Sequence, residues 1–266
     1  MTVLVVGGAG YIGGHTCKAL KKKYRPIVYD NLQNGHAWAA KFGPLVVGDL
    51  LDEKLLDQTF KTYEPVAVMH FASSIDCRAS MHDPSSYYHN NVAGSLALLR
   101  AMHKNNVKHL VFSSTAAVYG LPQTEQLKES HPCAPINVYG KSKWMVEEMI
   151  HDFEKAYGLS SVILRYFNAA GADPAGELGE AHSPETHLIP LALKVAIGKE
   201  SHLNVFGDGT AKRDYIHVTD LADAHLKALE WLLSDKGPMT FNLGTGKGHS
   251  LLDVLSVVES VSQTPV

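Results

Sequence analysis

Two side chains that could move a proton together, Tyr139 and Lys143, are separated by three residues in the run Tyr-Gly-Lys-Ser-Lys. On a helix, residues i and i+4 share one face, so both side chains would reach the same space. A free tyrosine has a pKa of about 10, which is too high for a base at neutral pH. A nearby ammonium group favours the phenolate, so we expect Lys143 to lower the pKa of Tyr139. The pair is a candidate acid/base for a hydroxyl group.

A glycine-rich turn near the N-terminus predicts a dinucleotide site. Gly7, Gly10 and Gly13 follow an apolar run and open a helical pattern. The first permits a tight turn, the second lets the backbone approach a pyrophosphate, and the third lets the helix pack closely on the strand. The helix N-terminus would then direct free N–H groups at the phosphates.

Asp30 indicates which dinucleotide is bound. It stands twenty residues after Gly10, at the end of the second predicted strand. A carboxylate in this position bonds the ribose 2′-hydroxyl and would repel a 2′-phosphate. The sequence therefore favours NAD over NADP, with a plain turn role for Asp30 as the alternative.

Alternating strand and helix patterns predict an α/β fold, a Rossmann-like doubly wound parallel sheet. Predicted strands cover residues 3–6, 26–29, 45–47, 66–70, 109–113 and 161–165, and predicted helices cover residues 12–22, 53–62, 87–104 and 142–157. We expect an NAD-binding Rossmann domain over residues 1–170.

After residue 170 the alternation loosens. A stretch rich in Gly, Pro and acids, residues 172–184, predicts a loop. It precedes helices at 188–198, 218–233 and 250–258 and strands at 203–206 and 240–243. We interpret residues 171–266 as a smaller lobe laid over the carboxyl edge of the sheet.

Composition excludes several classes of function. The chain has 266 residues, 19% of them charged, and a formal net charge of -3, which gives no basic surface for nucleic acid. No apolar run reaches the length of a membrane span, and no signal peptide precedes the first strand. Three scattered cysteines fit a reducing compartment, so a cytoplasmic location is expected. No metal site is expected, because the histidines show no ligand spacing; His15, His70 and His217 are interpreted as hydrogen-bonded polar residues.

The spacing Gly-x-x-Gly-x-x-Gly together with Tyr-x-x-x-Lys resembles the extended short-chain dehydrogenase/reductase superfamily. Further motifs, spread from residue 3 to about 254, make the chain similar to the UDP-glucose 4-epimerase family. They include Val5-Val-Gly-Gly-Ala-Gly-Tyr-Ile-Gly13, Phe112-Ser-Ser-Thr115, Arg165-Tyr-Phe-Asn168, Arg213-Asp-Tyr-Ile-His217 and Phe241-Asn-Leu-Gly-Thr-Gly246.

This resemblance implies an isomerase of carbohydrate metabolism that interconverts UDP-glucose and UDP-galactose. Hydride would pass from sugar C4 to tightly bound NAD, and would return to the opposite face of a 4-keto sugar. Tyr139 would be the acid/base, Lys143 would bind the nicotinamide ribose, and Thr115 would bond the sugar hydroxyl.

The resemblance also implies the binding residues. The expected cofactor residues are Gly7, Gly10, Tyr11, Ile12, Gly13, Asp30, Asn31, Asp49, Leu50, Phe71, Ala72, Asn90, Ser113, Tyr139, Lys143 and Phe167. The expected substrate residues are Thr115, Asn168, His187, Leu188, Asn204, Phe206 and Arg213. The alternative for Arg213 is an ion pair with Asp214.

Three other functions compete with this one. A nucleotide-sugar 4,6-dehydratase is disfavoured, because Ala116 and Ala117 stand where its acidic pair would be. A UDP-xylose/arabinose 4-epimerase and a catalytically weak NAD-binding protein stay open. The similar family usually continues past the helix at 250–258 with further uridine-binding residues. The resemblance therefore implies that residues 171–266 form a smaller nucleotide-sugar-binding lobe that is incomplete.

A homodimer is expected from two predicted helices, 87–104 and 142–157. Their apolar residues exceed what one sheet face needs, and in the similar family these helices pair across a twofold axis. The residues concerned are Val92, Leu96, Leu99, Met145, Met149 and Phe153.

Overall fold

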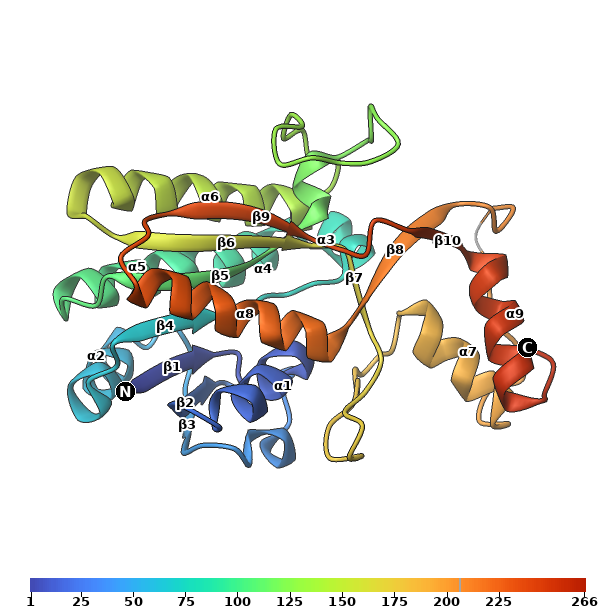
Figure 1. Cartoon of the computed structure of the whole chain (residues 1–266), viewed down its shortest axis with the longest axis horizontal. Helices are drawn as coiled ribbons and strands as arrows, with labels where there is room; N and C mark the ends of the chain where they lie inside the picture. The colour runs from blue at the N-terminus through green and yellow to red at the C-terminus, as the bar shows by residue number, and fades with distance from the viewer. Residues whose placement is uncertain (206) are drawn as a thin grey trace.

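A large parallel sheet and a small second sheet organise the chain in this computed structural model, which describes residues 1–205 and 207–266 (Figure 1). Within these residues the large sheet has the strand order β3-β2-β1-β4-β5-β6-β9. Its strands are β1 (Thr2–Val6), β2 (Arg25–Asp30), β3 (Leu45–Val47), β4 (Ala67–His70), β5 (His109–Thr115), β6 (Ser160–Tyr166) and β9 (Met239–Leu243). All of its pairings are parallel, which confirms the predicted Rossmann-like sheet.

The strands are apolar in sequence because both faces of the sheet are covered. Leu4 and Val6 of β1 belong to one buried cluster, whereas Val3 and Val5 belong to the other. Side chains alternate between faces along a strand, so one short run supplies both cores. This is why the sequence shows continuous hydrophobic segments at these strands.

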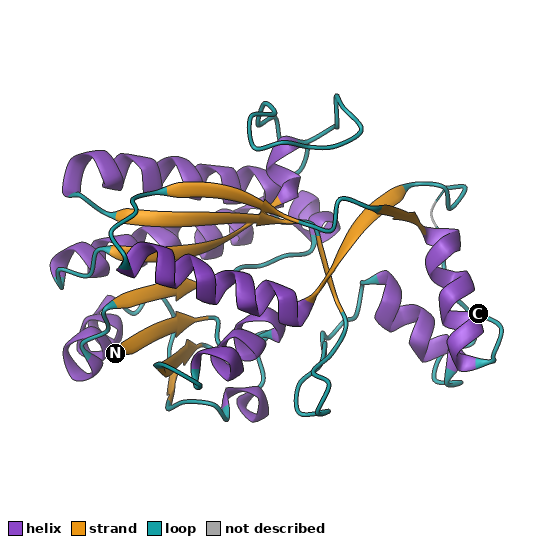
Figure 2. Cartoon of the chain, in the orientation of Figure 1, coloured by secondary structure: helices purple, strands orange, loops and turns teal. Residues whose placement is uncertain are grey.

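Helices cover the two faces in separate layers (Figure 2). One face carries α2 (Glu53–Tyr63), α5 (Gly94–Lys104) and α6 (Val138–Tyr157), and the other carries α1 (Tyr11–Leu20) and α8 (Val218–Leu233). The remaining helices are η1 (Ala37–Ala40), α3 (Cys77–His82), α4 (Pro84–Tyr87), η2 (Tyr88–Ala93), η3 (Ala116–Tyr119), α7 (Leu188–Ala196) and α9 (Leu251–Ser262). Among the described residues, no helix has the length and apolar character needed to cross a membrane.

The helix predicted over residues 87–104 is interrupted. Asp83 accepts a hydrogen bond from the Ser86 N–H and begins α4, and a wider π-helical turn, η2, follows before α5. This turn contains Asn91, whose side chain donates to Ser142 of α6 at 2.9 Å. Such widened turns have little signature in the hydrophobic pattern and frequently occur at functional sites.

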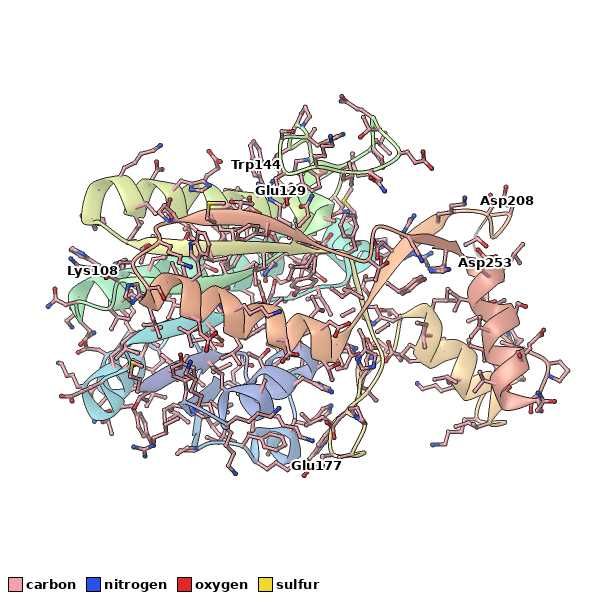
Figure 3. The ribbon with its side chains drawn as sticks, in the orientation of Figure 1. Lys108, Glu129, Trp144, Glu177, Asp208 and Asp253 are labelled. Atoms are coloured by element: carbon pink, nitrogen blue, oxygen red, sulfur yellow. The ribbon has the colours of Figure 1, made fainter. Side chains whose placement is uncertain are left out.

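Two elements late in the chain complete the large sheet. β9 pairs with β6 in parallel register, Leu164 opposite Phe241, and α8 packs against α1. The loop over residues 121–137 also reaches β9, because Glu129 accepts a hydrogen bond from the Asn242 N–H at 2.8 Å (Figure 3). The division at residue 170 stays a prediction, and its second part contains one strand of the large sheet, β9, and one helix that covers a face of that sheet, α8.

The smaller sheet has the order β10-β8-β7, with β7 (Asn168–Ala170) parallel to β8 (Lys212–His217) and β10 (Gly248–Ser250) antiparallel to it. These short strands were not predicted, because three to six residues carry too little periodicity. The strand predicted at 203–206 is wrong for residues 203–205, which form no strand, and Phe206 lies outside the described residues. Instead Leu203 packs against α7 and α9.

Candidate active site

A cavity of about 1980 Å³ opens at the carboxyl edge of the large sheet and extends to the smaller sheet. Parallel α/β sheets bind ligands at this edge, where loops leave the strands. Most of the residues predicted to bind cofactor or substrate line it together. They are Gly7, Gly10, Tyr11, Ile12, Gly13, Asp30, Asn31, Asp49, Leu50, Phe71, Ala72, Asn90, Thr115, Tyr139, Phe167, Asn168, His187, Leu188, Asn204 and Arg213.

Two positions of the glycine turn, Gly7 and Gly13, accept no residue other than glycine. Gly7 has φ +77°, and a Cβ there would lie 2.4 Å from the backbone nitrogen of Ala72. A Cβ at Gly13 would lie 2.2 Å from the Gly7 carbonyl oxygen. Gly10 caps α1 without a side-chain hydrogen bond, so the first N–H groups of the helix face the cavity. This end of α1 suits an anionic phosphate.

Asp30 ends β2 and holds the glycine turn as well as facing the cavity. Its carboxylate accepts hydrogen bonds from the Ala9 N–H at 3.0 Å and the Leu32 N–H at 2.9 Å. Burial raises the pKa of Asp30, and these two backbone donors oppose that rise. The remaining lone pairs of the carboxylate can accept from ribose hydroxyls.

The loop that follows β3 is hydrogen-bonded to Asn31, the residue after Asp30. The Asn31 side chain donates to Asp49 at 2.9 Å, and Asp49 also accepts from the Leu51 N–H at 2.9 Å. Tyr29 donates its hydroxyl to the Asp49 carbonyl at 2.7 Å. These bonds hold Asp49 and Leu50 against the same part of the cavity, where the flat face of an adenine would lie.

The first turns of α6 carry the predicted acid/base pair. Asn137 caps the helix by accepting a hydrogen bond from the Gly140 N–H at 2.7 Å, so α6 begins at Val138 and not at residue 142 as predicted. Tyr139 and Lys143 are 7% and 3% exposed. Both therefore lie in a water-poor setting one helical turn apart.

The pKa of the Tyr139 phenol is shifted in the folded chain. Burial raises the pKa of its phenol above the ordinary value, and Tyr166 adds to the rise. A hydrogen bond with the Thr115 side chain lowers it, but only in part. Thr115 itself accepts from the Ala117 N–H at 3.1 Å, which leaves its hydroxyl proton for Tyr139. Burial is thus the dominant influence on this pKa, and the lowering by Lys143 together with a positively charged nicotinamide stays a prediction.

The ammonium group of Lys143 is itself strongly affected by burial. Burial lowers the pKa of Lys143 to about 7, while Glu147 opposes the shift. Its ammonium nitrogen lies 4.7 Å from the centre of the Phe112 ring, and no hydrogen bond to it occurs among the described residues. A buried amine without an acceptor is ready to bond the hydroxyls of a ligand.

A buried ion pair between Glu147 and Arg165 was not predicted from the sequence. Glu147 is 1% exposed and accepts from Arg165, with separations of 3.1 Å to each carboxylate oxygen from Nε. Ser114, next to Thr115, donates to the same carboxylate. Arg165 also donates to Tyr119 at 3.1 Å. This network connects α6 to β5 and β6. The only feature of the sequence that could have indicated it is the position of Glu147, four residues after Lys143.

Two predicted cofactor residues do not line the cavity. Lys143 lies just behind the lining, and Ser113 is fully buried with its hydroxyl 2.8 Å from Nε2 of His225. Among the described residues, His15 and His70 each form one hydrogen bond and His217 forms two, but His15 Nε2 and His70 Nδ1 have no partner.

Two predicted substrate residues, Asn168 and Arg213, line the cavity from the smaller sheet. Arg213 is exposed, and it forms no ion pair with Asp214 among the described residues. Asp214 instead accepts from the Thr245 and Gly246 N–H groups at 2.9 and 2.7 Å. The Arg213 guanidinium is therefore available to a phosphate. Phe206, predicted here, lies outside the described residues.

His187 is more constrained than the sequence suggested. Its Nδ1 lies 2.9 Å from a Glu180 oxygen and 3.0 Å from a Glu185 oxygen. These hydrogen bonds, that with Glu180 first, raise the pKa of His187 to about 9 against the effect of burial. Glu180, Glu185 and His182 also line the cavity and were not predicted, because they come from a loop without periodic pattern.

NAD fits this arrangement on the protein's own geometry. The glycine turn has no side chains that would block the approach of a phosphate, and the end of α1 offers free N–H groups to phosphates. Asp30 offers a carboxylate at the ribose position, and Lys143 offers a buried amine without an acceptor. These features cover the phosphates and both riboses of a dinucleotide.

Comparison with known proteins gives the class. The sequence pattern of the NAD dependent epimerase/dehydratase family matches residues 3–244. The chain therefore belongs to this family, and NAD is its cofactor.

Particular relatives are UDP-glucose 4-epimerases. That of Rhizobium leguminosarum bv. trifolii is 50% identical over 99% of this chain and 83% of its own length. The crystal structure of UDP-glucose 4-epimerase from Brucella ovis in complex with NAD has a TM-score of 0.96 and 48% identity, over 97% of this chain and 82% of that one. The enzyme from Bifidobacterium longum in complex with NAD+ and UDP has a TM-score of 0.93 and 37% identity, over 100% and 84%.

Proposed function

We propose that this chain is a UDP-glucose 4-epimerase that interconverts UDP-glucose and UDP-galactose. The observation that carries the proposal is the position of Tyr139 beside Thr115, in one cavity with the glycine turn and Arg213. A base, a cofactor site and a phosphate-binding cation thus share one space. The similarity to proteins named UDP-glucose 4-epimerase, at 50% identity, supports this substrate.

Tyr139 acts as the base toward the 4-hydroxyl of the sugar and later returns the proton. Thr115 donates to the Tyr139 oxygen and so stabilises its phenolate. Bound NAD supplies the hydride acceptor and, afterwards, the donor for the opposite face of the 4-keto sugar. Lys143 holds the ribose, and its charge favours the phenolate once ligand hydroxyls replace the missing acceptors. Burial keeps water from the transfer.

The diphosphate end depends on Arg213, Asn168 and Leu188. Arg213 offers a bidentate pair of donors from β8, and Asn168 begins β7 at the centre of the same cavity. The Leu188 N–H lies in the first turn of α7, where free N–H groups favour an anion. We assign these three residues to the UDP part of the substrate.

Elimination of water from the sugar is disfavoured by the residues present. Ala116 and Ala117 face the cavity directly after Thr115. A dehydratase needs a carboxylate and an acid at this point to remove water, and two methyl groups cannot supply them. Epimerisation needs the Tyr139 proton step and a hydride acceptor, which bound NAD would supply, and it needs no second acid/base pair, so it is the chemistry that these residues support. A UDP-pentose is the second candidate substrate.

The experiment that tests the proposal is conversion of UDP-galactose to UDP-glucose by the purified chain with no reductant added. Continuous turnover with a constant amount of bound NAD supports a self-regenerating epimerase. Absence of turnover on both hexose and pentose UDP-sugars, with NAD still bound, would contradict it and favour a silent NAD-binding protein.

A homodimer through α5 and α6 is part of the proposal. Leu96 and Met145 expose 38% and 39% of their surface on these helices, and the partly buried Met149 and Phe153 pack against the core. Leu99 is 2% exposed and belongs to the core, so it is not part of the proposed dimer interface. Leu96→Glu should convert the dimer to a monomer in light scattering. A monomeric unmodified protein would contradict this assembly.

We infer a cytoplasmic location from the thiols. Cys17 is buried, whereas Cys77 is exposed and Cys133 is half-buried, and all three are free. Free exposed thiols persist in reducing compartments. Fractionation of the producing cells, with the chain recovered outside the cytoplasm, would contradict the inference.

A further inference from the structure

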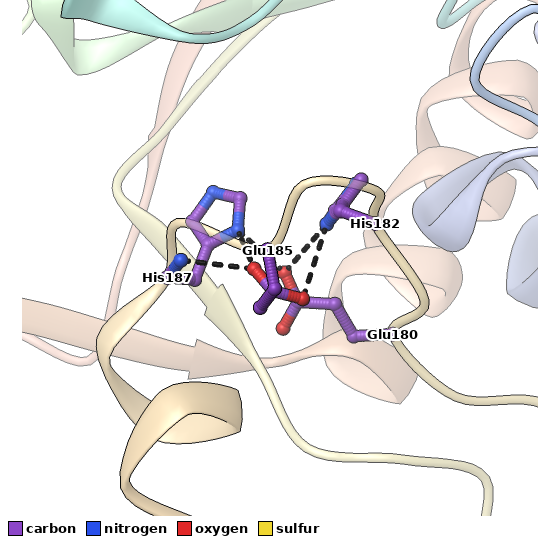
Figure 4. A group of neighbouring side chains, drawn as sticks. All are labelled: Glu180, His182, Glu185 and His187. Carbon is purple, nitrogen blue, oxygen red and sulfur yellow. Dashed lines mark hydrogen bonds and ion pairs between the residues drawn. The ribbon is translucent and has the colours of Figure 1, made fainter. Parts of the chain in front are cut away.

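Four potential metal ligands converge in the loop between β7 and α7. They are Glu180, His182, Glu185 and His187, and their ligand atoms all lie within 4.8 Å of one another. Figure 4 shows the two histidines on either side of the two carboxylates. All four residues come from one eight-residue stretch, so a single loop conformation brings them together.

The separations between these atoms are those of ligands around one small cation. Nδ1 of His187 lies 2.9 Å from Glu180 and 3.0 Å from Glu185. Nδ1 of His182 lies 3.2 Å from the same Glu180 oxygen, Oε1, and 3.7 Å from the second Glu185 oxygen, Oε2. Bonds of about 2.0 Å to nitrogen and oxygen place tetrahedral ligands about 3.3 Å apart. The four measured separations lie around that value.

His182 supplies an independent observation. Its Nδ1 is buried and makes no hydrogen bond within the described residues, although a Glu180 oxygen is 3.2 Å away. The distance suits a bond, but the direction does not. A short separation without hydrogen-bond geometry is expected for two metal ligands, because each points at the common metal centre and not at the other ligand. Buried polar atoms without a hydrogen bond are uncommon and call for an explanation.

Charge and burial agree with a divalent ion. The side chains of Glu180 and Glu185 are only 9% and 3% exposed, so two carboxylates share a nearly dry space. Burial of like charges is costly unless positive charge balances them, and the His187 ring that contacts both carboxylates can carry only one positive charge. A divalent cation with two neutral imidazoles gives the group no net charge.

We propose that Glu180, His182, Glu185 and His187 form a binding site for a divalent first-row transition metal, of which Zn²⁺ is the best match. Two imidazole nitrogens and two carboxylate oxygens are ligands that Zn²⁺ accepts in tetrahedral sites. Four protein ligands make a closed, structural site, and not one with an open position for chemistry.

The site would fix the wall of the cavity at its diphosphate end. His187 is the residue directly before α7, and the four ligands line the cavity beside Leu188. A bound ion would hold the loop in one conformation, and so would position the start of α7. The site is independent of the proposed epimerisation, because none of the four ligands is needed for the Tyr139 proton step.

Cobalt is the probe for this site, because Co²⁺ in a tetrahedral N/O site absorbs visible light whereas Zn²⁺ does not. The purified chain with NAD bound is treated with chelator, dialysed and titrated with Co²⁺. We expect a visible band that saturates at one equivalent and disappears when Zn²⁺ is added. Absence of the band and of heat on Zn²⁺ titration would overturn the proposal.

Two variants locate the ion. Glu185→Gln and His182→Asn should each weaken binding of Co²⁺ by about tenfold or more, because each removes one of four ligands. His202→Asn is the matched control: His202 lines the same cavity but bonds Ser201 at 2.9 Å, away from the cluster. Retained NAD and an unchanged circular dichroism spectrum show that each variant is folded. Equal binding by all three variants would place the ion elsewhere and overturn the assignment.

Discussion

The ammonium nitrogen of Lys143 lies 4.7 Å from the centre of the Phe112 ring, with an aromatic face where a buried cation would usually meet a carboxylate. Cation–π attraction offsets part of the lost hydration. Burial nevertheless lowers the pKa of Lys143 to about 7. The charged lysine is therefore held in the fold at the expense of stability.

Lys143→Met should stabilise the protein without ligand while it abolishes most turnover. The charged form is destabilised by burial, so its removal should raise the free energy of unfolding by about 1–3 kcal/mol below pH 7. As pH rises above about 7 the folded lysine loses its proton, and the advantage of Met shrinks toward pH 10. Urea denaturation at pH 6.5 and 9.5 measures this; a destabilised variant at pH 6.5 would contradict it.

Tyr139→Phe should keep NAD and the fold but lose about 10²–10⁴-fold in turnover, because only the acid/base oxygen is removed. The ring stays in a position that is 7% exposed, so packing is preserved. The measurement is the rate of UDP-galactose conversion together with the NAD content of the purified variant. Tyr88→Phe, on η2, is a control for loss of a phenol. Full activity in Tyr139→Phe would refute the assigned base.

Two adjacent glycines give a matched test of the cofactor turn. A Cβ at Gly13 would lie 2.2 Å from the Gly7 carbonyl oxygen, but a Cβ at Gly14 would meet its nearest atom at 3.6 Å. Gly13→Ala should therefore lose bound NAD and stability, whereas Gly14→Ala should be neutral or gain up to about 1 kcal/mol from helix propensity. Bound NAD is read from the absorbance of the purified proteins. Equal NAD content in both variants would count against the close packing.

The parallel sheet was predictable from the sequence because its central strands are buried on both faces. The run around Val3 to Val6 carries that signature, and the glycine turn that follows it fixes the cofactor end of the site. The positions of Tyr139 and Lys143 could also be predicted, because a helical spacing of four suffices. The assignment of cofactor and site edge followed from these local patterns.

The rest depended on tertiary contacts that a local pattern does not contain. β9 lies beside β6 although Leu243 follows Tyr166 by many residues, so sequence order suggested a separate lobe. The raised pKa of Tyr139 reflects burial, which spacing cannot report. The cluster around Glu180 forms in a loop where no period marks which side chains meet.

Glu147→Gln should destabilise the chain by about 3–5 kcal/mol, because it leaves Arg165 buried without its partner. Glu148→Gln is the matched control, since Glu148 is exposed on the same helix. Chemical denaturation measures both. A loss in Glu147→Gln no larger than that in Glu148→Gln would show that the ion pair with Arg165 does not hold α6 against the sheet.

In the proposed reaction, hydride leaves sugar C4 and returns to it within one active site. The experiment uses UDP-galactose carrying deuterium at C4, in ordinary water with no added reductant, and follows the label in the UDP-glucose formed by mass spectrometry and NMR. We expect the deuterium to be retained at C4, because Tyr139 exchanges only the hydroxyl proton. Loss of the deuterium to water would contradict it and would point to removal of the C4 hydrogen as a proton.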